Sequence, residues 1–135
     1  MALDAPDFVT RVQVAVTVEN VPVVPEVGTE VAAGASGAYT GTDQTYQSVA
    51  KWTVSADKVG ELKEILIISS NYALTLVKVS VAGVDEPDDW APQAAMPLIY
   101  EDLKLAAAAE VEVQCKSSDG TSITVDALIV GKEIG

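Results

Sequence analysis

Histidine is absent from this 135-residue chain, and arginine occurs once, at Arg11. Histidine is the usual proton shuttle near neutral pH and the commonest metal ligand, and arginine is the usual bidentate clamp for phosphate and carboxylate groups. Most familiar catalytic sites cannot be assembled without them. We therefore predict that the chain is not an enzyme, that it uses no cofactor or metal, and that it acts through structure or binding.

Cysteine and basic residues are also scarce. Cys115 is the single cysteine, so no internal disulfide can form, and its place among alternating residues predicts a buried thiol that packs as a small hydrophobe. Eight basic residues are scattered among 20 acidic ones, which gives a formal net charge of −12. Because nucleic-acid binding depends on a basic surface that neutralises phosphates, we predict no nucleic-acid partner.

Long apolar runs are missing as well. No segment approaches the ~20 apolar residues that a membrane-spanning helix needs, and the first residues lack the basic start and apolar run of a secretory signal. We expect a protein that is made in the cytoplasm and has no membrane partner. At this length, we expect one ordinary domain with a core that needs no covalent staple.

Alternation with a period of two, the pattern of half-buried strands, is what the sequence does contain. Near the start it places four valines on one face of a predicted strand: Val12, Val14, Val16 and Val18. Two prolines follow, and residues 28–43 are rich in glycine, alanine, serine and threonine, which predicts a long loop or an arm. We expect residues 1–45 to be an N-terminal strand and flexible arm whose valines bind a partner. Alternatively, this strand is simply the first strand of its own sandwich.

The remaining residues, 46–135, predict a β-sandwich domain. Strands are expected at residues 46–54, 60–69, 72–82, 96–100, 109–116 and 122–134, with a tight link at 102–105 and an Asp-Gly hairpin turn at 117–121. In the last strand, alternation predicts a core face with Ile123, Val125, Ala127 and Ile129 and a mixed outer face with Thr124, Asp126 and Leu128. A short helix over residues 58–66 is the weaker alternative for the second strand. About eight short strands in total predict two antiparallel sheets that form an all-β jelly roll.

Acidic side chains are the remaining candidates for catalysis or metal binding. A glycosidase could use a pair of carboxylates, for instance Asp126 with Glu101, Asp102 or Glu133. Four carboxylates within residues 85–89 could hold calcium, but their spacing matches no EF-hand loop. We favour solvated acids in both cases. Beside this run, Trp90 is either a lid over the core or an exposed contact residue, and we include it among the candidate partner-binding residues.

A carbohydrate-binding module is the main competing function. Such modules stack sugar rings on exposed aromatic side chains. Aromatic residues make up only 5% of this chain. Some of these rings must fill the core, so a large aromatic platform is not expected.

Several short patterns resemble small virion proteins of tailed bacteriophages. They are Lys-Trp-Thr-Val at 51–54, Val-Gly-Glu-Leu-Lys-Glu-Ile at 59–65, Ser-Asn-Tyr at 70–72, Asp-Leu-Lys-Leu at 102–105 and Lys-Ser-Ser-Asp-Gly-Thr-Ser-Ile at 116–123. Over residues 46–134, the chain is similar in particular to jelly-roll capsid decoration (cement) proteins, and less closely to head-fibre and tail-associated jelly rolls. The resemblance implies a homotrimer that binds the major capsid protein on the exterior of the virion. It implies no catalytic residue.

The composition is consistent with such an assembly protein. Hydrophobic residues make up 49% of the chain, and valines are available on both faces of the predicted strands, which predicts a homo-oligomer with apolar surface between subunits. A high negative charge keeps a protein soluble at high local concentration, and several subunits binding a lattice at once gain affinity through multivalency.

Overall fold

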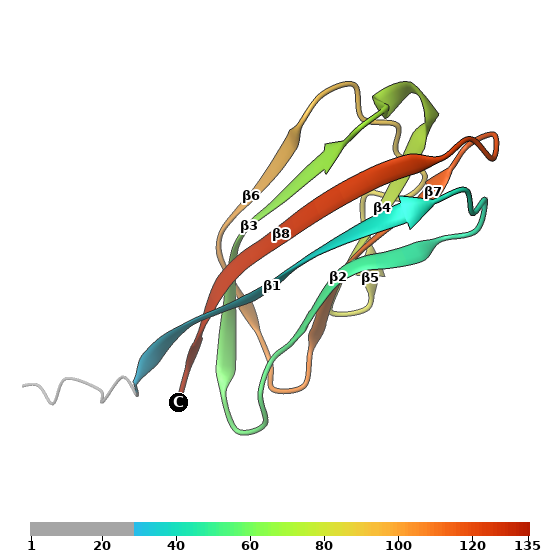
Figure 1. The fold of residues 1–135 in the computed structure, drawn as a ribbon. Coiled ribbons are helices and arrows are strands. Elements are labelled where there is room, and N and C mark those ends of the chain that lie inside the picture. The colour runs from blue at the N-terminus through green and yellow to red at the C-terminus, as the bar shows by residue number, and fades with distance from the viewer. Residues whose placement is uncertain (1–28) are drawn as a thin grey trace, which may run out of the picture.

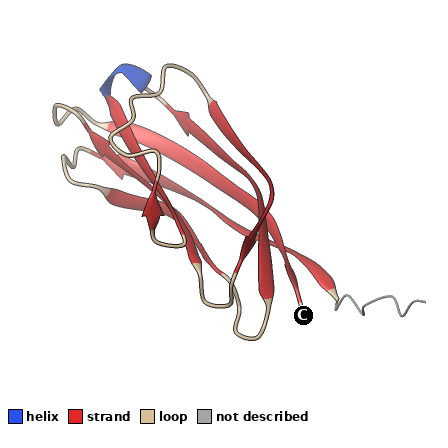
Figure 2. Cartoon of the chain, turned by 180° about the vertical axis from the view of Figure 1, so that it is seen from behind, coloured by secondary structure: helices blue, strands red, loops and turns tan. Residues whose placement is uncertain are grey.

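A computed structural model describes residues 29–135 of the chain (Figure 1). Within this range, the chain forms eight strands: β1 (Glu30–Gly41), β2 (Gln47–Thr53), β3 (Val59–Ser69), β4 (Thr75–Val81), β5 (Val84–Asp85), β6 (Met96–Leu105), β7 (Glu110–Ser117) and β8 (Ile123–Ile134). One turn of 3₁₀-helix, Tyr72–Leu74, precedes β4 and appears in Figure 2 among strands and loops. The predicted all-β class is confirmed, and the helix considered for residues 58–66 is replaced by β3.

The strands form two four-stranded sheets that pack face to face. Sheet I has the order β1-β8-β3-β6, and sheet II has the order β2-β7-β4-β5. Every neighbouring pair is antiparallel. The pairing is nested, since β1 pairs with β8, β2 with β7, β3 with β6 and β4 with β5, while the chain crosses repeatedly between the sheets. This nested double sheet is the jelly-roll arrangement, so the predicted fold type is confirmed.

The core lies between the two sheets and consists of inward-facing residues at alternate positions. Its fully buried members include Ile65 and Ile67 of β3, Val77 and Val79 of β4, and Val111, Val113 and Cys115 of β7. On β8, the predicted inward face is confirmed, because Ile123, Val125, Ala127 and Ile129 are all buried. Cys115 is fully buried, which confirms its predicted place in the core, and this burial raises the pKa of its thiol to about 12.

The loop or arm predicted over residues 28–43 is wrong, because Glu30–Gly41 forms β1 and pairs along its whole length with β8. The sandwich therefore begins before the expected boundary at residue 46. The small residues were interpreted as a loop signal, whereas here they permit close approach of backbones. A Cβ at Gly37 would lie 2.0 Å from the carbonyl oxygen of Val49, and one at Gly34 would lie 2.0 Å from that of Ile129.

Two shorter connections also differ from expectation. The tight link predicted at 102–105 is part of β6, which continues through a register shift opposite Leu62 and Glu64. Glu101 and Asp102 adopt left-handed φ values of 45° and 63°, so the strand bends there without ending. The turn at residues 117–121 is no hairpin, because it joins β7 of sheet II to β8 of sheet I.

Candidate interaction surface

The outer faces of the two sheets differ in polarity. Sheet II exposes mainly polar side chains, among them Lys78, Ser80, Glu112, Gln114 and Lys116. The outer face of sheet I instead carries a group of apolar side chains around the row formed by Pro97, Leu66 and Leu128, with Glu64 between two members of the next row and Asp126 at its margin. We call this group the outer patch: Leu66, Ile68, Pro97, Ile99, Leu128 and Val130.

The outer patch breaks the usual alternation of a half-solvated antiparallel sheet. Its residues alternate with core residues such as Ile65, Ile67 and Ile129, so they cannot turn inward. Ile99 is 64% exposed, Leu128 is 44% exposed and Ile68 is 42% exposed. Antiparallel sheets with one wet face normally carry polar residues there, and clustered exposed apolar residues mark a contact surface. The outer patch is therefore the part of the described surface best suited to contact another protein.

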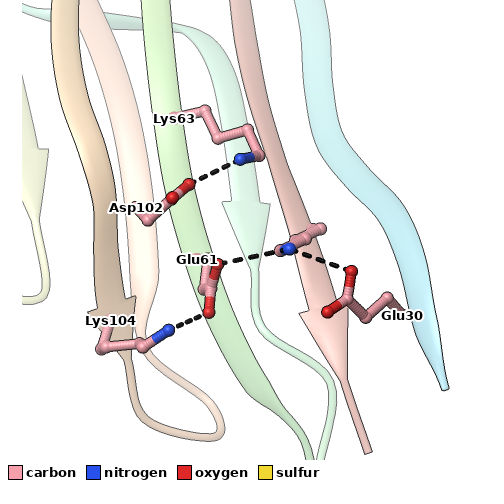
Figure 3. A network of polar contacts seen from close by, with 6 residues as sticks. Glu30, Glu61, Lys63, Asp102 and Lys104 are labelled. Carbon is pink, nitrogen blue, oxygen red and sulfur yellow. Dashed lines mark hydrogen bonds and ion pairs between the residues drawn. The ribbon is translucent and has the colours of Figure 1, made fainter. Parts of the chain in front are cut away.

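A row of alternating charges borders the outer patch at one end of sheet I (Figure 3). Lys132 on β8 lies 2.9 Å from Glu30 on β1 and 3.6 Å from Glu61 on β3. Lys104 on β6 pairs with the same Glu61, so the row crosses all four strands.

Glu61 is the centre of this row and is only 5% exposed. A buried carboxylate is costly unless it is paired, and the two lysines supply that pairing. Next to it, Lys63 lies 2.5 Å from Asp102 and lowers the pKa of that carboxyl. The row contains both signs and is internally neutralised, so it limits the apolar area without giving the face a strong charge.

The two lateral sides of the sandwich, where the edge strands of the two sheets face each other, also differ. On the β1/β2 side, small residues such as Gly37 bring the sheets into backbone contact. On the opposite side, β5 and β6 are separated by an apolar cavity of about 650 Å³. We call it the edge groove, and the residues that matter most in its lining are Val84, Trp90, Leu98, Tyr100, Leu103 and Leu105.

The segment that carries Trp90 forms one wall of the edge groove. Backbone hydrogen bonds tie it to β4: the N–H of Val77 donates to the carbonyl of Trp90 at 2.8 Å, and the N–H of Trp90 donates to the carbonyl of Val77 at 3.0 Å. The opposite wall is β6, which within residues 29–135 pairs only with β3. Its Leu103 is 41% exposed although it faces the groove. Tyr100 is partly buried in this wall, and that burial raises the pKa of its hydroxyl.

Tyr46 anchors the same wall from the outer face of sheet II. Two lysine ammonium groups lie over its ring, with Lys78 Nζ 4.9 Å and Lys116 Nζ 4.5 Å from the ring centroid. The Tyr46 hydroxyl donates a hydrogen bond to Asp89, which lowers the pKa of that carboxyl, and Lys116 adds a second contact at 3.4 Å. Asp89 is thus used in fixing the loop, and residues 29–135 contain no group of three side chains suited to a metal ion.

Trp52, one of the aromatic residues considered for sugar binding, is buried and 5% exposed. It spans the sandwich from β2 and rests on two glycines of sheet I, because a Cβ at Gly131 would lie 2.9 Å from its ring and one at Gly60 would lie 3.3 Å from it. Its Nε1 donates to Glu133 Oε2 at 2.9 Å, and the N–H of Ser55 donates to the same oxygen at 3.2 Å.

The acidic residues considered as catalytic pairs are not brought together. Asp126 and Glu133 both lie on β8 but face opposite sides of sheet I, about 23 Å apart along the strand. Asp102 is paired with Lys63, and Glu101 lies beside it on β6, far along the sheet from Asp126.

Of the predicted partner-binding residues, Trp90 lies at the edge groove and is 44% exposed. Of its two predicted roles, the exposed position fits the contact residue better than the lid. Val12, Val14, Val16 and Val18 lie outside the described residues. Sequence reasoning did not single out the outer patch, although the mixed outer face of residues 122–134 was its signal in the sequence.

Comparison with known proteins adds no relative. No family model matches the chain, and no curated protein sequence matches it. None of the helical structure in the described part of the chain is long and apolar enough to cross a membrane.

Proposed function

We propose that this protein is a structural component of a virus particle: a jelly-roll subunit that self-assembles and binds the outer surface of a tailed-phage head as a decoration protein. The outer patch is the observation that carries the assembly part of the proposal. An apolar face on one sheet, opposite a polar face on the other, supports a subunit with one buried side and one solvated side.

The fold and the charge support the virion setting. Two-sheet jelly rolls are frequent in capsid and lectin domains, so the fold favours binding and assembly over any one chemistry. A subunit with a net charge of −12 resists indiscriminate association at the high local concentration of a capsid lattice. We propose a homotrimer with the major capsid protein as partner, the trimer following from the family resemblance.

Cosedimentation with phage heads tests this function. Purified full-length protein is mixed with heads stripped of their decoration proteins, and bound protein is measured after centrifugation. Saturable binding at a fixed ratio of copies to capsid proteins is expected. Binding that scales linearly with added protein, or no binding to heads from several phages, would contradict the proposal.

Carbohydrate binding is the second candidate, and the edge groove is the observation that favours it. Trp90 is half-exposed there, with Tyr100 on the opposite wall and the carboxylate of Glu86 nearby. A glycan-array signal that Trp90→Ala abolishes and Trp52→Phe leaves intact would support this function over capsid binding.

A further inference from the structure

We infer that the edge groove is the docking site for residues 9–18 of a second copy of this chain, which add as a strand to the free edge of β6. The inference deepens the proposed function, on which it rests, by naming how neighbouring subunits join.

The groove offers what an added strand needs. The outer edge of β6 has no strand neighbour among residues 29–135, so a row of its backbone N–H and C=O groups is available for pairing. Beside that edge, the groove exposes apolar side chains, with Val84 59% exposed and Leu103 41% exposed. Strand addition satisfies such backbone groups and places every second side chain of the incoming segment in the groove.

Residues 9–18 have the matching pattern. Their alternation places Val12, Val14, Val16 and Val18 on one face and the polar residues Arg11, Gln13 and Thr17 on the other. The segment is as long as β6, which has 10 residues. Docked on β6, it would bury its valines against the groove and leave its polar face toward solvent.

The length of the connection to β1 favours docking of residues 9–18 from a neighbouring chain over docking of the same residues from the chain's own N-terminal part. The start of β1 and the end of β6 lie at the same end of sheet I, because Glu30 pairs with Ile134, Ile134 with Val59, and Gly60 with Leu105. An antiparallel partner of β6 would therefore have its own end near Met96, at the far end of the sheet. Returning from there to Thr29 covers about 33 Å along the strand and about 19 Å across the four strand spacings between the added strand and β1, roughly 38 Å in all.

The connection between residues 18 and 29 of one chain can span this distance only when it is almost fully extended. The steps from Val18 to Thr29 span about 36–40 Å only when fully extended. They span about 34 Å in the polyproline conformation that Pro22 and Pro25 favour. Within one chain, residues 9–18 could therefore reach β6 without a fully extended connection only if they ran parallel to it. Every described strand pair is antiparallel, which is the more stable arrangement. A second copy has no such restriction.

Disulfide trapping between full-length chains tests the inference directly. A Leu103→Cys chain is mixed with differently tagged chains carrying Val12→Cys, Val14→Cys or Val16→Cys, under mild oxidation. At least one valine variant should form a mixed disulfide at least fivefold faster than the opposite-face control Gln13→Cys. Cys115 is fully buried, so the unmodified chain should remain uncrosslinked. The inference would be overturned if Gln13→Cys were trapped equally fast. It would also be overturned if crosslinks formed only within single chains that carry both Leu103→Cys and one of the valine substitutions.

A charge-matched pair of variants provides an independent readout. In the full chain, Val14→Glu with Val16→Glu should weaken self-association at least tenfold in sedimentation experiments, while Gln13→Glu with Thr17→Glu should change it less than twofold. Equal effects of the two would overturn the inference. Trapping on Leu103 without binding to phage heads would contradict the capsid function alone, and head binding without trapping would overturn only this inference.

Discussion

At the scale of single residues, glycines decide how closely the backbones approach. Gly37 lets β1 lie against the carbonyl of Val49, and Gly60 and Gly131 form the surface on which the Trp52 ring rests. Neither role depends on the conformational freedom of glycine. Both depend on the absence of a side chain where another group already fills the space.

Gly37→Ala should therefore destabilise the fold. Its Cβ would lie 2.0 Å from the oxygen of Val49, a backbone atom that moves only if the strand moves. We expect a loss of about 2–3 kcal/mol in the free energy of unfolding, as in other overpacked sites. Urea denaturation measures this loss. Ser36→Ala, at the exposed neighbouring position, is the control and should change stability by less than about 0.5 kcal/mol.

Glu133 should make stability depend on pH. Hydrogen bonds from Ser55 and Trp52 lower the pKa of this carboxyl below its ordinary value of 4.5. Because the folded-state pKa is the lower one, the ionised group stabilises the fold above pH 4.5, and this contribution is lost as the pH falls through the lowered value.

Glu133→Gln tests this dependence. We expect the variant to be less stable than the unmodified protein by about 1 kcal/mol at pH 7, the net contribution typical of one hydrogen bond. The difference should shrink toward pH 3. Urea unfolding at both pH values measures it, and a difference that stays constant or grows in acid would contradict the assignment.

At the scale of elements, β1 and β6 are the two edge strands of sheet I, and they differ in kind. β1 is made largely of small residues, and it closes its side of the sandwich against β2. β6 bends at Glu101 and Asp102 and stands away from β5, which leaves the edge groove open. The sandwich is thus closed on one side and open on the other.

The described strands form a core without residues 1–28, because the buried cluster is drawn from β2, β3, β4, β6, β7 and β8. A truncated chain of residues 29–135 should therefore fold. We expect a β-type circular dichroism spectrum and a cooperative thermal transition, with weaker self-association than we propose for the full chain. A non-cooperative melt would mean that residues 1–28 contribute to the subunit's own core.

At the scale of the whole molecule, the two outer faces of the sandwich differ in polarity. Sheet II presents lysine, glutamate, glutamine and serine side chains to solvent, whereas sheet I presents the outer patch and the row of charges beside it. A subunit in an assembly needs this asymmetry, because one face must be buried while the other remains wet.

Leu128→Glu combined with Ile68→Glu should reduce self-association. Both side chains are exposed in the subunit, at 44% and 42%, so the fold should tolerate the change, while two buried charges would be costly in an interface. Sedimentation velocity should show a shift toward monomer. Ser80→Glu with Gln114→Glu, on the outer face of sheet II, adds the same charge and should leave the distribution unchanged. Equal shifts would show that net charge alone is responsible.

The sequence by itself determined most of the strands and the core that they enclose. Alternation identified the inward residues of β8 and the buried position of Cys115, because strand periodicity fixes which side chains share a face. It also identified a jelly-roll sandwich of about eight strands. The segment predicted as a loop at residues 28–43 failed because glycine and alanine occur both in turns and where backbones touch, and only the neighbouring strand distinguishes the two.

Tertiary structure decided where surfaces form. Leu66, Pro97 and Leu128 are far apart in the chain, and the register of three strands brings them into one row of the outer patch. The edge groove likewise exists only because β5 ends sheet II while β6 ends sheet I on the same side of the sandwich. A local pattern specifies the face on which a side chain lies, but which faces become neighbours depends on strand order, and strand order is set by long-range pairing that no local pattern contains.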